Sequence, residues 1–318
     1  MTLSLFISKA YKKSIGRLFN TIIGLLEVGV LAFRKKNDEI FLITSNPLGD
    51  CVYGMAYANA LKENKQKKLV IISDRKRKRL IESYKIDAKI ISLDGASREW
   101  KWTQHLNGSR LCVLIAKKLE IYNIVPWVVC SMNKYKKSNA LDLIRDKMYS
   151  LPKSAKIAYP DFSNEPITSI PNFKQNKDRI AIINPYSTSM DDVDFEFFNH
   201  ISLKLLERGY IVYTNVVGSQ KAVTGGSKLN CSVEEFYAIC NQVPIVVSVR
   251  SGIIDFSISA NTNFYIVYFL DQFKDKGDGF AGQYALDAWK TNNVDESVYS
   301  NIESNLAHFE KYLNEHKL

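Results

Sequence analysis

Histidine and cysteine are scarce in this chain of 318 residues, which holds four of the first and five of the second. The histidines are scattered, and no two cysteines have C-x-x-C spacing, so neither a zinc site nor a disulfide framework is indicated. Most cysteines lie in apolar runs, as small buried side chains do. We therefore expect a cytoplasmic protein that needs no metal or other cofactor.

Several short signatures are missing as well. The chain has no G-x-G-x-x-G, no G-x-x-x-x-G-K-[ST] and no G-x-S-x-G, which disfavours dinucleotide oxidoreductases, P-loop hydrolases and α/β-hydrolases. A membrane-spanning helix needs about 20 apolar residues. The best candidate, residues 18–33, is 16 residues long and contains Asn20 and Glu27. This apolar stretch also comes late for a cleavable signal peptide and lacks an A-x-A site.

Acidic residues are outnumbered, with 33 Asp and Glu against 43 Lys and Arg, which gives a net charge of +10. This excess favours a polyanionic partner such as nucleic acid, an anionic membrane or a phosphorylated substrate. The densest basic run covers residues 75–79. With 46% hydrophobic and 24% charged residues, the chain is typical of globular proteins, and its length suits two domains of about 150 residues each.

Residues 1–36 combine cations with an apolar stripe at helical spacing. One interpretation is an interfacial helix on anionic lipid, which would make the protein peripheral at the inner face of the plasma membrane. The other is a helix that packs on its own domain or on a second subunit. The cations are Lys9, Lys12, Lys13 and Arg17, and the stripe runs through Ile15, Leu18, Phe19, Ile22, Leu25, Leu26 and Val30.

After this segment, short apolar runs alternate with helical patterns, as in parallel β-α-β units. We predict an α/β fold of two Rossmann-like, doubly wound domains that face a cleft, covering residues 37–160 and 179–318, with a linker over 161–178. Strands are expected at residues 39–45, 69–73, 88–93, 126–130, 179–184, 210–214, 244–249 and 264–269. Helices are expected at residues 50–62, 75–84, 141–149, 195–208, 232–242, 253–260 and 298–313.

Ligands of such folds bind in loops at the carboxyl ends of strands. The first loop of this kind carries Asn46, Gly49 and Asp50. Asp50 is either the N-cap of the following helix or a carboxylate that takes a proton from an acceptor hydroxyl. Asn46 and Gly49 would then help to bind that acceptor.

Two loops of the second half favour a phosphate. Ser187 and Ser189 precede a helix, where hydroxyls and free backbone N–H groups donate to an anion. Gly218 marks a flexible loop after the next strand. The D-x-D of Asp192 and Asp194 precedes a helix, so we interpret it as acidic first-turn residues rather than as a metal site.

The third loop follows the apolar strand at 244–249 and contains Arg250, Ser251, Gly252 and Asp255. An arginine there can grip a diphosphate with two parallel hydrogen bonds, while Ser251 donates and Gly252 lets the backbone approach. A plain strand-to-helix turn with a solvated arginine is the alternative.

The order of these motifs resembles the GT-B glycosyltransferases related to bacterial heptosyltransferases, over most of residues 39–270. The resemblance implies that Asp50 is the catalytic base, with Gly49 facing the acceptor, and that Ser187, Ser189, Ser251 and Gly252 hold the donor diphosphate. Where that family has Asp before Ser-Gly and His shortly after, this chain has Arg250 and Asp255. The segment at residues 249–256 looks closer to transferases of capsule and O-antigen assembly.

The resemblance implies a metal-independent, inverting transfer of a sugar from a nucleotide-sugar donor to a glycan or lipid-linked acceptor in bacterial surface polysaccharide synthesis. No nucleic acid is expected as a partner. A non-catalytic, membrane-associated scaffold that keeps a decayed nucleotide-sugar site is the alternative, and a nucleic-acid-binding protein is a third that rests on charge alone.

Overall fold

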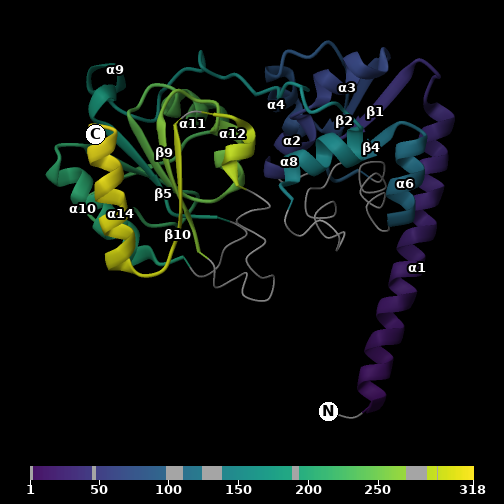
Figure 1. Ribbon diagram of the computed structural model, residues 1–318, viewed down its shortest axis with the longest axis horizontal. Coiled ribbons are helices and arrows are strands. Elements are labelled where there is room, and N and C mark those ends of the chain that lie inside the picture. The colour runs from purple at the N-terminus through teal and green to yellow at the C-terminus, as the bar shows by residue number, and fades with distance from the viewer. Residues whose placement is uncertain are drawn as a thin grey trace. The chain divides into compact units, whose positions relative to one another are not determined.

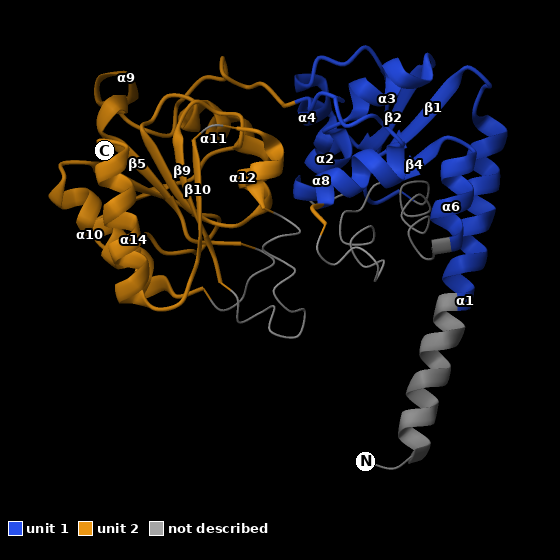
Figure 2. Cartoon of the chain, viewed as in Figure 1, with its two compact units in different colours: residues 1–135, 140–158 blue, residues 136–139, 159–318 orange. Residues whose placement is uncertain are grey.

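A computed structural model describes residues 3–44, 48–97, 110–123, 138–187, 193–269, 285–291 and 293–318. The chain divides into two compact units, coloured blue and orange in Figure 2. The first comprises residues 1–135 and 140–158, and the second comprises residues 136–139 and 159–318. The segment at 161–178 thus falls in the second unit.

The first unit is built on a four-stranded parallel sheet in the order β3-β2-β1-β4 (Figure 1). Its central strands are apolar along their length, as expected for strands covered by helices on both faces. The strand predicted at residues 126–130 lies outside the described residues, whereas β4 was not predicted. The strands are β1 Glu39–Ile43, β2 Lys68–Asp74, β3 Lys89–Leu93 and β4 Ile121–Asn123.

Helices of the first unit differ from the prediction in several places. The helix at residues 110–118 was not predicted, and the one expected at 75–84 begins as a 3-10 helix. The expected helix at 50–62 is broken after Met55, and the carbonyl of Ala56 accepts a hydrogen bond from Ala158 N at 2.7 Å instead of continuing the helix. The helix at 141–149 changes into a π-helix at Ile144. The helices are α1 Leu3–Arg34, α2 Leu48–Met55, α3 Ala58–Lys65, η1 Arg75–Arg77, α4 Lys78–Ser83, α6 Arg110–Lys118, α8 Ala140–Leu143 and η4 Ile144–Tyr149.

The second unit has a six-stranded parallel sheet in the order β10-β9-β8-β5-β6-β7. Counted within the unit from β7 to β10, this is the order 3-2-1-4-5-6 of the doubly wound nucleotide-binding fold. The strand order reverses between β5 and β8, which is where such folds bind their ligand. The strands are β5 Ile180–Asn184, β6 Ile211–Asn215, β7 Ser227–Leu229, β8 Ile245–Val249, β9 Asn263–Tyr268 and β10 Val294–Val298.

One face of this sheet is covered by α10 and α14, which share a hydrophobic core with alternate residues of the strands. Figure 1 shows α11 and α12 on the opposite side. Helix α10 ends as predicted, because Gly209 takes the left-handed conformation with φ +83°. The helices are α9 Phe173–Asn176, η5 Lys177–Arg179, α10 Phe195–Glu207, α11 Val233–Cys240, α12 Gly252–Ser257, η7 Leu286–Trp289 and α14 Ile302–Glu315.

The predicted start of the terminal helix at residue 298 is wrong. Val298 is the last residue of β10 and pairs with Tyr268. Helix α14 begins four residues later, after Asn301, whose side chain accepts a hydrogen bond from Ser304 N at 2.8 Å. β7 and β10 both escaped prediction because they are short and polar.

Candidate functional site

A polar network crosses the switch point of the second unit. Asn184, the last residue of β5, is only 2% exposed, and its Nδ2 donates to Ser248 Oγ at 2.8 Å and to Ser251 Oγ at 3.3 Å. Asn215, at the end of β6, donates in turn to Asn184 Oδ1 at 2.8 Å. The network thus joins the carboxyl ends of β5 and β8, which flank the switch point, and of β6 beside β5.

This network orients the hydroxyl group of Ser251. Because Ser251 Oγ accepts from Asn184, its own proton can be donated to a further acceptor, such as a phosphate oxygen. Ser251 directly precedes α12, and Gly252 is the first residue of that helix. Asn184, Asn215 and Ser248 were not predicted as site residues. The signal that could have found them is a polar residue at the end of an apolar strand.

Arg250 and Asp255 pair with each other inside the protein. Arg250 Nη2 contacts Asp255 Oδ1 in a close ion pair, and the two residues are 5% and 4% exposed. Arg250 Nη1 also donates to the carbonyl of Ser251 at 3.0 Å. The sequence predicted that this guanidinium binds a diphosphate. In the structure its charge is compensated by Asp255, and it stabilises the turn that carries Ser251. The alternative of a solvated arginine is wrong.

Tyr186 connects the loops that follow β5 and β6. Its hydroxyl donates to the carbonyl of Lys221 at 2.8 Å and accepts from Lys221 N at 3.1 Å. The loop of half-buried Ser187 is thereby held to the loop of Gly218, which is exposed and has a φ of +61°. Ser189 lies outside the described residues.

The first unit brings Gly49 and Asp50 to the carboxyl end of β1. Helix α2 begins at Leu48, so Asp50 is a half-buried first-turn residue and not the N-cap that one interpretation predicted. Asn46 lies outside the described residues. The neighbouring Cys51 is fully buried, and this burial raises the pKa of its thiol to about 12, while the positive charge of Arg77 acts in the opposite direction.

Arg77 of the basic run lies close enough to Cys51 in α2 for its charge to act on that thiol. Arg77 ends the short η1 helix that directly follows β2, and Asp74 caps this helix by accepting from Lys76 N at 3.0 Å. The run therefore lies at the carboxyl edge of the first sheet, the same edge as Asp50.

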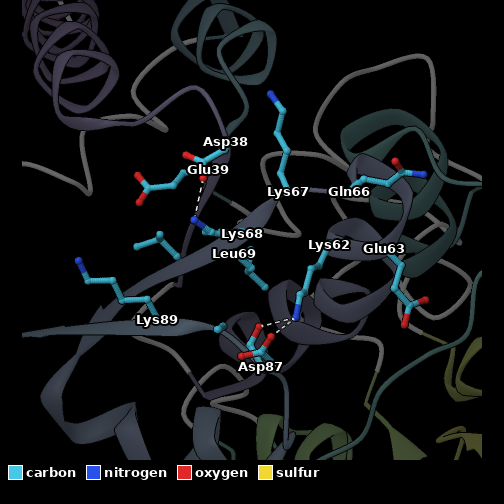
Figure 3. Close-up of a pocket in the computed structure, with 12 residues that line it drawn as sticks. Asp38, Glu39, Lys62, Glu63, Gln66, Lys67, Lys68, Leu69, Asp87 and Lys89 are labelled. Atoms are coloured by element: carbon cyan, nitrogen blue, oxygen red, sulfur yellow. Dashed lines mark hydrogen bonds and ion pairs between the residues drawn. The ribbon is translucent and has the colours of Figure 1, made fainter.

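A hollow at the opposite edge of this sheet carries no comparable chemistry (Figure 3). It lies at the amino ends of β1, β2 and β3, and its charges are largely paired. Lys62 Nζ lies 2.6 Å from Asp87 Oδ2, and Lys68 Nζ lies 2.9 Å from Asp38 Oδ2. Within the described residues, no group of three or more His, Cys, Asp or Glu side chains could hold a metal ion.

Comparisons with known proteins find similarity in structure only. No protein-family model matches the sequence, and neither does any curated protein. The glycosyl transferase family 9 protein from Veillonella parvula has 13% identity and a TM-score of 0.53, over 86% of this chain and 91% of its own.

Two E. coli structures are similar to a comparable degree. The ADP-heptose LPS heptosyltransferase II has 10% identity and a TM-score of 0.57, over 88% of this chain and 100% of its own. The heptosyltransferase WaaC with ADP has 13% identity and a TM-score of 0.56, over 87% and 99%. Identities this low establish the fold alone. The predicted α/β fold of two Rossmann-like units is confirmed, and these glycosyltransferase structures share it.

Proposed function

We propose that this protein is a glycosyltransferase of bacterial surface polysaccharide synthesis that moves a sugar from a nucleotide-sugar donor to a glycan or lipid-linked acceptor. The observation that carries the proposal is the oriented Ser251 hydroxyl at the switch point of the second unit. The similarity to a heptosyltransferase whose structure contains ADP supports it.

The donor diphosphate would bind at the carboxyl ends of β5 and β8. Ser251, Gly252 and the loop of Ser187 would donate hydrogen bonds, and the loop of Gly218 would lie beside the nucleotide. Such donors stabilise the negative charge of a departing nucleoside diphosphate. Because they are hydroxyls and N–H groups, we propose that this departure is metal-independent. The Arg250–Asp255 pair would hold the turn in place.

Asp50 would act as the general base. Its carboxylate would take the proton of the acceptor hydroxyl while the oxygen attacks the anomeric carbon and the nucleoside diphosphate leaves with the bonding electrons. One direct displacement inverts the anomeric configuration. The positive Arg77 near the start of α2 suits an acceptor that carries negative charge.

We propose further that the enzyme works as a peripheral protein at the inner face of the plasma membrane. A lipid-linked acceptor would be anchored there, and the basic excess of the chain favours an anionic surface. No helix among the described residues is long and apolar enough to cross a membrane.

Nucleoside diphosphates provide the first test. A panel with adenine, uracil, guanine and cytosine bases is added to the full chain, and the melting temperature is measured beside samples with DNA or RNA. We expect one diphosphate to raise the melting temperature and the nucleic acids to leave it unchanged. Ser251→Ala should lose this shift, whereas Ser304→Ala, at an exposed position of α14, should keep it. The reverse pattern would contradict the donor site.

A measurement of sugar transfer distinguishes an enzyme from a non-catalytic scaffold. The scaffold alternative is favoured by the charge compensation of Arg250. With the donor that binds, Asp50→Asn should lower the transfer rate by roughly 10²–10⁴-fold and keep nucleotide binding. Asp38→Asn, at the opposite edge of the same sheet, is the control and should remain active. Binding without turnover in the unaltered protein would support the scaffold.

A further inference from the structure

Helices α1 and α6 of the first unit are in contact, and both expose large apolar side chains. Cys112 Sγ of α6 donates to the carbonyl of Thr21 of α1 at 3.4 Å. On α1 the exposed side chains recur every three or four residues, so they share one face of the helix. They are Leu18, Phe19, Ile22, Leu26, Val30 and Phe33 on α1, and Leu111 and Leu114 on α6.

This face is not the one that holds α1 to its domain. The inner face contributes Val28, Leu31 and Ala32 to a core formed with β1, β2 and β4 and with Ala116 of α6. Phe33, in contrast, is 92% exposed and Leu26 is 66% exposed. The docking of α1 is therefore complete without the outer face, and soluble monomers rarely leave so many adjacent large side chains uncovered.

Within α1 and α6, the exposed charged residues that flank this outer face are cations. Four cations precede it along α1, between residues 9 and 17, and the exposed Arg34 and Lys36 follow it. Lys118 is exposed at the end of α6. Within residues 1–36 the one acidic residue is Glu27, and it is buried, with 4% of its surface exposed.

We infer that the outer face of α1 and α6 lies in the headgroup region of an anionic bilayer, with both helix axes in the membrane plane. Apolar side chains would enter the acyl boundary, and the cations at both ends would meet lipid phosphates. This inference rests on the proposed peripheral location and names its contact surface, in which α6 takes part. A second copy of the chain suits the face less well, because it would bring the same cations against one another.

Vesicle flotation of the full chain tests this surface. Vesicles of phosphatidylcholine with and without phosphatidylglycerol are compared, and binding is measured for the unaltered protein and for L111S/L114S. We expect binding to need phosphatidylglycerol, and the α6 variant to bind at least about tenfold more weakly. Leu203→Ser is the matched control, because Leu203 is an exposed leucine of α10 in the second unit, and it should bind normally.

Two results would overturn the inference. One is equal vesicle binding by the α6 variant, with its folding verified by circular dichroism. The other is a dimer in solution, without vesicles, that the same variant dissociates, since this would assign the face to a second copy. The melting shift with nucleoside diphosphate, measured on the same samples, keeps the two proposals separate. Vesicle binding without a nucleotide shift would contradict the transferase and leave the membrane surface standing.

Discussion

Asn184 is the side chain on which the candidate donor site depends. Its amide is the sole group in the described network that reaches both Ser248 and Ser251, and it is itself held by Asn215. Fully satisfied buried networks of this kind fix the orientation of each member. A substitution at Asn184 should therefore weaken phosphate binding indirectly, through the orientation of Ser251.

We expect Asn184→Ala to lower the free energy of unfolding by about 1–3 kcal/mol, because it removes the acceptor of Asn215 Nδ2 and the donor to Ser248 and Ser251. It should also weaken nucleoside diphosphate binding, since Ser251 loses its orientation. Urea denaturation and a binding titration measure the two effects. Asn59→Ala, at an exposed position of α3, should change neither by a measurable amount. Unchanged binding by a destabilised Asn184→Ala would limit Asn184 to a structural role.

The Arg250–Asp255 pair affects stability through buried charge. Both groups are buried, so removing one of them leaves the other as a buried charge without its counter-ion. We expect Asp255→Asn to cost about 3–5 kcal/mol in urea denaturation, and R250M/D255L to recover most of this loss. A loss below about 1 kcal/mol for Asp255→Asn would show that water reaches the guanidinium.

At the scale of elements, α1 carries an unusual buried carboxyl. Both side-chain oxygens of Glu27 are buried without a hydrogen-bond partner, and burial raises its pKa from 4.5 to about 8. The folded state therefore binds the proton more tightly than the unfolded chain does. The contribution of Glu27 to stability is greatest below pH 4.5 and falls as the pH rises toward 8, because burial opposes its ionisation only in the folded state.

Glu27→Gln should remove this pH dependence. The variant carries no titrating group at residue 27, so its free energy of unfolding should stay level where that of the unaltered protein declines. At the upper end of the window it should be the more stable protein, by about 1–3 kcal/mol. Urea denaturation at several pH values measures both proteins. Parallel curves for the two would show that Glu27 does not titrate in this range.

Also at the scale of elements, the predicted linker at residues 161–178 is hydrogen-bonded to α11. Ser232 caps α11 by accepting from Glu235 N at 3.1 Å. Glu235 Oε1 accepts from the backbone N–H groups of Thr168 and Ser169, at 2.6 and 2.7 Å, rather than completing a capping box with Ser232. Burial opposes ionisation of Glu235, but these donors outweigh it and lower the pKa. Residues 168 and 169 are thus fixed to the second unit.

At the scale of the whole molecule, the chain consists of two units with separate sheets and separate cores. We expect calorimetry to resolve two unfolding transitions. The nucleoside diphosphate should raise the temperature of one, and Asp255→Asn should lower the same one, because both act on the second unit. A single transition that the ligand and the variant both shift as a whole would mean that the units unfold cooperatively.

The sequence by itself determined the elements with strong local patterns. Runs such as IAIIN and IVVSV specify buried strands, and Gly209 and Ser232 mark helix ends, because each signal acts between near neighbours in the chain. The alternation of these elements was enough to predict two α/β halves and the loops at their strand ends.

Only the tertiary structure decided which of those loops meet and which charges cancel. Asn184 and Ser251 lie 67 residues apart and come together because β5 and β8 are neighbours in the sheet. The charge of Arg250 is compensated within its own turn, and polar β7 and β10 become strands by pairing with β6 and β9. These outcomes depend on contacts between distant segments, for which a local pattern holds no information.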